Sequence, residues 1–143
     1  MKKFFTSFIA VFALLMLGTN QFAMANDEFT KEPIENGRPR LVHSSYYTGT
    51  IGDNLKVTMY LDIYSNGDIS GWYFYNKNGS KNKLVLVGRK NYDGTVELLE
   101  FNEKDELTAG FEGSFNSRGE FVGIMYVVHS NKRYSCKLYP AQF

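Results

Sequence analysis

The chain has 143 residues, with 16 basic and 15 acidic side chains, ten tyrosines and twelve phenylalanines. This aromatic content is not that of a disordered chain. A net charge of +1 gives no electrostatic basis for binding nucleic acid or an anionic membrane. The length fits one domain around one hydrophobic core.

The first 25 residues have the pattern of a secretory signal peptide. Lys2 and Lys3 precede an apolar run over residues 4–18, and Ala23 and Ala25 flank Met24 as in a cleavage site. A membrane anchor is the alternative, but the run is shorter than the ~20 residues that a spanning helix needs. We therefore expect cleavage after Ala25 and a periplasmic or secreted protein without a membrane attachment. The cleaved chain would carry 14 basic and 15 acidic residues, because the segment removed contains only Lys2 and Lys3.

Residues 26–42 are polar and contain Pro33, Gly37 and Pro39 without any periodic pattern. Such a composition predicts a mobile N-terminal arm. The rest of the chain, residues 43–143, is expected to form the folded domain.

This domain alternates strand-like runs with short turns. In the run from Leu55 to Tyr64, the apolar residues at every second position predict a strand with one buried face. The same reasoning predicts eight strands, at His43–Ile51, Leu55–Tyr64, Asp68–Asn76, Lys81–Lys90, Thr95–Asn102, Leu107–Phe115, Glu120–His129 and Arg133–Tyr139. Because all connections are short, we predict an all-β fold, an eight-stranded antiparallel up-and-down barrel. A β-sandwich is the alternative.

Four of the turns share the form x-[Asn/Asp/Arg]-Gly, at residues 65–67, 77–79, 92–94 and 117–119. A two-residue hairpin turn would force a positive φ on Arg118, whereas a three-residue loop places only the glycine there. We therefore favour three-residue loops. At residues 65–67 such a loop pairs Ile63 with Ile69 and Met59 with Tyr73, whereas a two-residue loop would turn Trp72 and Phe74 inward.

The favoured register leaves large aromatic side chains outside the barrel. These are Tyr60, Tyr64, Trp72 and Phe74 on the second and third strands. A soluble monomer rarely exposes so large an apolar patch. Either another part of the chain covers the patch, or it is an interface for a protein partner or a second copy.

The residues that usually carry chemistry are few. His43 and His129 have no ligand-spaced partner, so no metal site is predicted. The single cysteine, Cys136, alternates with Tyr134 and Leu138, which indicates a core residue rather than a nucleophile. No catalytic motif or cofactor motif is found, and we expect a protein that is not an enzyme and has no cofactor.

Glu100 is the one acidic residue with an unusual position. It alternates with Val96 and Leu98 and would then point into the barrel, where it needs a hydrogen-bonding partner such as Tyr73 or Tyr75. The opposite register buries Leu99 and Phe101 instead and leaves Glu100 in solvent. The sequence leaves both arrangements open. The neighbouring acidic residues between 97 and 112 are expected to be solvated.

The glycine-containing runs at residues 71–75, 84–88, 94–100 and 108–113 resemble those of small exported bacterial proteins of unassigned function. They are also loosely similar to avidin-like and lipocalin-like barrels. The resemblance covers residues 46–138 and implies a β-barrel, and it carries over no functional residue.

Two functions follow as expectations. The first is a non-enzymatic binding protein of the periplasm, of inhibitor or immunity type, that uses the outer aromatic residues. The alternative is a carrier that holds a small molecule in the barrel mouth beside Tyr73, Tyr75 and Glu100.

Overall fold

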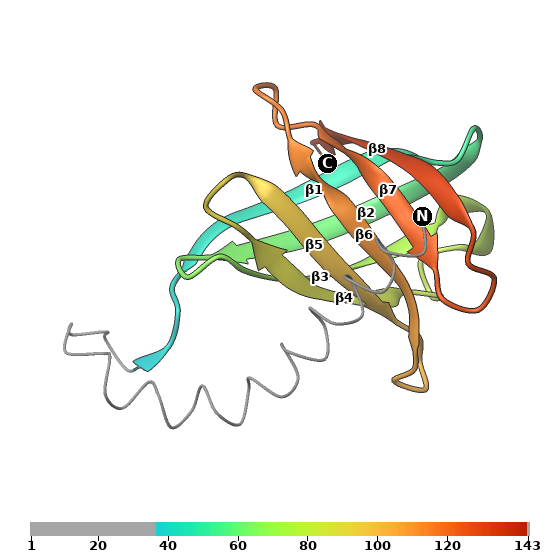
Figure 1. Ribbon diagram of the computed structural model, residues 1–143, viewed down its shortest axis with the longest axis horizontal. Helices are drawn as coiled ribbons and strands as arrows, with labels where there is room; N and C mark the ends of the chain where they lie inside the picture. Colours follow the sequence, from blue (N-terminus) through green and yellow to red (C-terminus); the bar gives the residue numbers. More distant parts are fainter. Residues whose placement is uncertain (1–36, 143) are drawn as a thin grey trace. The chain divides into compact units, whose positions relative to one another are not determined.

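The computed structural model describes residues 37–142 (Figure 1). The predicted signal peptide and most of the predicted arm lie outside the described residues. The first strand begins at Leu41, so the last two residues of the expected arm belong to the barrel.

Eight antiparallel strands form a closed barrel in which each strand pairs with its neighbours in sequence and the first pairs with the last (Figure 1). The strands are β1 (Leu41–Ile51), β2 (Leu55–Tyr64), β3 (Asp68–Tyr75), β4 (Leu84–Lys90), β5 (Thr95–Phe101), β6 (Leu107–Phe115), β7 (Phe121–Val127) and β8 (Arg133–Ala141). The predicted up-and-down barrel is thus confirmed, and the alternative sandwich is wrong. Closure pairs the edges of β1 and β8 that a sandwich would leave open.

Most turns have the predicted three-residue form. The amide of Gly67 donates to the carbonyl of Tyr64 at 2.9 Å, and that of Gly119 donates to Asn116 at 3.0 Å. Both glycines have positive φ values, of 90° and 74°, whereas Arg118 does not. The chain therefore turns with one left-handed residue, which glycine adopts without steric cost.

The prediction at residues 77–79 is wrong. The short 3-10 helix η2 (Asn76–Asn78) follows β3, and β4 starts only at Leu84 rather than at Lys81. The amide of Gly79 closes this turn on Asn76 at 3.2 Å, and the side chain of Asn82 donates to the carbonyl of Asn78 at 2.6 Å. The glycine thus ends a helical turn instead of a hairpin.

The barrel interior contains the predicted apolar residues. The register between β2 and β3 pairs Ile63 with Ile69 and Met59 with Tyr73, as expected. The buried core consists of side chains from all eight strands, namely Tyr47, Ile51, Val57, Met59, Leu61, Ile69, Tyr73, Leu86, Val96, Leu98, Ala109, Phe111, Phe121, Met125, Cys136 and Leu138. Leu99 and Tyr126, which alternate with core residues, are also buried.

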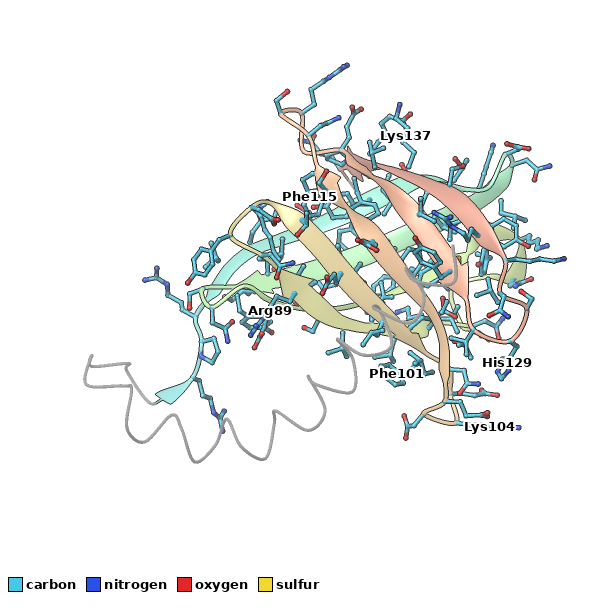
Figure 2. The ribbon with its side chains drawn as sticks, in the orientation of Figure 1. Arg89, Phe101, Lys104, Phe115, His129 and Lys137 are labelled. Atoms are coloured by element: carbon cyan, nitrogen blue, oxygen red, sulfur yellow. The ribbon has the colours of Figure 1, made fainter. Side chains whose placement is uncertain are left out.

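The two ends of the barrel carry different connections. The turns after β1, β3, β5 and β7 lie at one end, here called the η2 end because it contains η2. The turns after β2, β4 and β6 lie at the opposite end. Figure 2 labels Phe101, Lys104 and His129 at the η2 end, and Arg89 and Phe115 at the other.

Candidate functional site

The barrel interior contains one buried carboxylate, that of Glu100, within the described residues. Its side chain is only 5% exposed and receives hydrogen bonds from the hydroxyl groups of Tyr73 and Thr108, the latter at 2.6 Å. The inward arrangement, one of two that the sequence left open, is therefore the one in the structure. Both carboxylate oxygens have a donor, which is what burial of a charge requires.

A bulge supplies the second donor. The pairing between β5 and β6 shifts after Glu100, which lies opposite Ala109, whereas the next residue, Phe101, lies opposite Leu107. Thr108 is the extra residue of β6 at this point. Such a bulge re-aims a side chain, and here it brings the Thr108 hydroxyl to Glu100.

Burial changes the acid–base properties of this group. Desolvation raises the pKa of Glu100, and the hydrogen bonds from Thr108 and Tyr73 oppose this shift without cancelling it. Burial also raises the pKa of Tyr73, an effect to which the neighbouring charge of Glu100 adds. The tyrosine therefore remains a hydrogen-bond donor to the carboxylate, because both shifts disfavour its ionised form.

Tyr75 lies beside this pair and closer to the barrel mouth. Its hydroxyl has two long contacts, 3.5 Å to the Tyr73 hydroxyl and 3.8 Å to the sulfur of Met125. The ring is half-buried, and burial raises its pKa. The structure thus brings together all three residues of the predicted ligand site, with Tyr75 the most exposed of them.

Cys136 is a core residue, as predicted. Its side chain is 1% exposed, and burial raises the pKa of its thiol to about 12. The thiolate that nucleophilic chemistry needs is therefore disfavoured.

The outer face of β1, β2 and β3 carries four aromatic side chains in contact, here called the aromatic row: Tyr46, Tyr60, Trp72 and Phe74. The ring of Trp72 lies 5.6 Å from that of Tyr60 and 6.1 Å from that of Phe74, at interplanar angles of 22° and 14°. Tyr46 lies 4.9 Å from Tyr60. Tyr46, Tyr60 and Trp72 are direct cross-strand partners, which explains why their rings meet.

Polar side chains border the aromatic row. The Tyr60 hydroxyl donates to Asp62 at 2.7 Å, and Ser44 donates to the same carboxylate oxygen at 2.5 Å. The Lys83 ammonium group lies 4.0 Å from the centroid of a Trp72 ring, a cation–π contact. The row is thus an apolar surface with a hydrogen-bonding margin on one side and a cation on the other.

Sequence reasoning identified three members of the row and missed Tyr46. The tight turn at residues 52–54 pairs Ile51 with Leu55, and counting back from it places Tyr46 opposite Tyr60. That signal was present in the sequence. Tyr64 was also predicted to belong to this surface, but no ring contact joins it to the row in the described part of the chain.

Other site types have little support among residues 37–142. The His43 ring lies 2.7 Å from the Ser45 hydroxyl, and both side chains lie outside the core. No group of three His, Cys, Asp or Glu side chains in this range could hold a metal ion. In the same range, no helix has the length and apolar character needed to cross a bilayer.

Comparisons with protein-family models, with curated proteins and with solved structures find no match for this chain. The structure itself agrees with the coarse part of the predicted resemblance, an all-β protein with a closed barrel.

Proposed function

We propose that this chain is an exported, non-enzymatic binding protein whose aromatic row contacts a macromolecular partner in the periplasm, as an inhibitor or immunity-type protein would. The observation that supports this proposal is the contact between the rings of Tyr60, Trp72 and Phe74 on the outer face of the barrel. Tyrosine and tryptophan are the residue types that most often dominate the energy of protein interfaces.

The packing of the row favours binding over a purely structural role. Each ring is already held by its neighbours, so little side-chain entropy remains to be lost when a partner binds. The row is carried by the strands of a closed sheet rather than by a loop, which gives a rigid surface. Truncation of a ring at such a site typically costs ~2 kcal/mol or more of binding energy.

The test is capture of partners from periplasmic extract by the tagged protein, followed by measurement of the affinity for the purified partner. We expect Trp72→Ala and Tyr60→Ala to weaken binding at least tenfold. Tyr139→Ala is the matched control, because Tyr139 is an aromatic residue on β8 that is 41% exposed and outside the row. Equal affinities of the row variants and the wild type would overturn the proposal.

A second function, a small-molecule carrier, has one observation in its favour. The half-buried Tyr75 hydroxyl has only long contacts and lies next to the Tyr73–Glu100 pair. A ligand at the barrel mouth that accepts a hydrogen bond could engage it. Ligand-induced rises in melting temperature, screened over a panel of small molecules and lost in Tyr75→Phe, would support this function. A screen without any such rise would oppose it.

A further inference from the structure

The outer face of β4 and β5 has a pattern that is complementary to itself. Three cross-strand pairs lie along it: Val85 with Phe101, Val87 with Leu99 and Arg89 with Glu97. Val85 and Val87 are each 48% exposed. One strand therefore contributes two valines and a cation, and its neighbour contributes two apolar residues and an anion at the same heights.

The loops at the η2 end continue this pattern. The connection between β3 and β4 carries Lys77, Lys81 and Lys83, and residues 69–92 contain no acidic side chain at all. The connection between β5 and β6 carries Glu103, Asp105 and Glu106 with a single lysine. A basic loop and an acidic loop thus flank the β4–β5 face on its two sides.

These charges are not neutralised within the barrel. The ion pairs of the described residues join Arg89 to Asp68 at 3.6 Å and Arg118 to Glu120 at 3.8 Å, and neither involves the two loops. On β5, Glu97 lies opposite another acid, Glu112. Burial raises the pKa of Glu112, and the negative charge of Glu97 adds to that shift. This side of the face therefore carries unbalanced negative charge.

We propose that the β4–β5 face is a dimer interface occupied by a second copy of this chain. A two-fold axis that lies in the plane of contact and runs along the seam between β4 and β5 exchanges the two sides of the face. It places the valines of β4 against the apolar residues of β5 of the second copy. It also places Arg89 opposite Glu97, and the basic loop opposite the acidic loop.

A second copy fits this face better than an unrelated partner does. An isologous interface needs the same patch on both molecules to complement itself, and a face with one basic flank, one acidic flank and an apolar centre meets that requirement. The expected charge of −1 for the cleaved chain leaves little overall repulsion between copies. Tyr46 and Tyr60, on β1 and β2, lie outside this interface, so the proposal does not rest on the proposed function.

A charge exchange between the loops tests the proposal. One variant of residues 26–143 carries Lys77→Glu, Lys81→Glu and Lys83→Glu, and the other carries Glu103→Lys, Asp105→Lys and Glu106→Lys. Native mass spectrometry and sedimentation velocity should show a dimer for the wild type and a dissociation constant raised at least tenfold for each variant alone. An equimolar mixture should restore dimers that contain one copy of each variant, because every loop then faces its opposite charge. Circular dichroism verifies that the variants remain folded.

A second pair of variants tests the apolar centre. Val87→Lys should also abolish the dimer. Val122→Lys should not, because Val122 is equally exposed, at 47%, but lies on β7. A wild-type protein that is monomeric at its highest soluble concentration would overturn the proposal. So would a mixture of the charge variants that dimerises no better than either variant alone, or equal effects of the two valine substitutions.

Discussion

Tyr73 donates its hydroxyl hydrogen bond to the carboxylate of Glu100 inside the barrel, and the two residues come from strands that are not neighbours. Tyr73 lies on β3 and Glu100 on β5, so the bond crosses the interior past β4. The ring of Tyr73 also contacts that of Phe111 on β6 edge to face, at 5.6 Å. A polar bond and an aromatic contact thus link the sheet across the core near the η2 end.

The first prediction concerns pH. Burial raises the pKa of Glu100 above its ordinary value of 4.5, so the folded state binds the proton more tightly than the unfolded state does. The stability that this proton provides is fully present below pH 4.5 and is lost as the pH rises through the folded-state pKa. Each pKa unit of the shift corresponds to about 1.4 kcal/mol.

Glu100→Gln removes this titration. The free energy of unfolding of the wild type, measured by urea denaturation from pH 4 to pH 8, should therefore fall relative to that of the variant as the pH rises. Glu106→Gln, an exposed substitution in the β5–β6 turn, is the control. Parallel pH profiles for the wild type and Glu100→Gln would contradict the prediction.

The second prediction separates the two interior tyrosines. Tyr73→Phe leaves one oxygen of a buried carboxylate without its donor, and the loss of a partner to a buried acceptor costs about 1–3 kcal/mol. Tyr75→Phe removes only contacts of 3.5 and 3.8 Å and should cost under ~0.5 kcal/mol, because such distances exceed those of good hydrogen bonds. Denaturation at pH 7 measures both variants. Equal losses would show that the bond to Glu100 contributes nothing specific.

Much of this fold could be predicted from the sequence, because alternation and turn chemistry are local signals. The turn at Gly67 alone determines the pairing of Met59 with Tyr73. The direction of Glu100 could not be predicted in this way, because β5 has apolar residues at both parities. Its direction depends on the register with β4 and β6, which places Glu100 opposite Leu86 and Ala109 in the core.

The parts that failed depend on contacts between segments. The glycine at position 79 has the same local sequence pattern as the hairpin glycines, but η2 and the side chain of Asn82 use it differently. The contact between Lys83 and Trp72 depends on where this longer loop returns to the sheet. The self-complementary face of β4 and β5 required the cross-strand pairs, which only the closed register supplies.

The third prediction concerns strand curvature. Gly71 faces the interior between Leu61 and Leu86, and a Cβ atom at this position would meet the carbonyl oxygen of Tyr60 on the adjacent strand. Because that obstacle is backbone, relief requires the strands to separate, and Gly71→Ala should lower the unfolding free energy by about 1–3 kcal/mol. Ser70→Ala, at the preceding position on the same strand, is the control and should change it by less than ~0.5 kcal/mol. Thermal and urea denaturation give both values, and a neutral Gly71→Ala would contradict the prediction.

The last prediction concerns the turn between β5 and β6. Its amide of Asp105 donates to the carbonyl of Asn102 at 3.0 Å, as the glycine amides do in the other three-residue turns. Asp105 therefore occupies the left-handed position, with a φ of 58°, although it has a side chain. That side chain forms no hydrogen bond or ion pair within the described residues.

Asp105→Gly should consequently raise the free energy of unfolding by up to ~1 kcal/mol, because glycine adopts this conformation without the clash between Cβ and the backbone. Glu103→Gly is the matched control. It removes an acid from the same turn at a position without positive φ, so it gains no such relief and should lower stability by up to ~1 kcal/mol through the added freedom of the unfolded chain. Opposite signs for the two substitutions in urea denaturation would support this account of the turn. A loss of stability in Asp105→Gly as large as that in Glu103→Gly would show that backbone strain at Asp105 has no measurable cost.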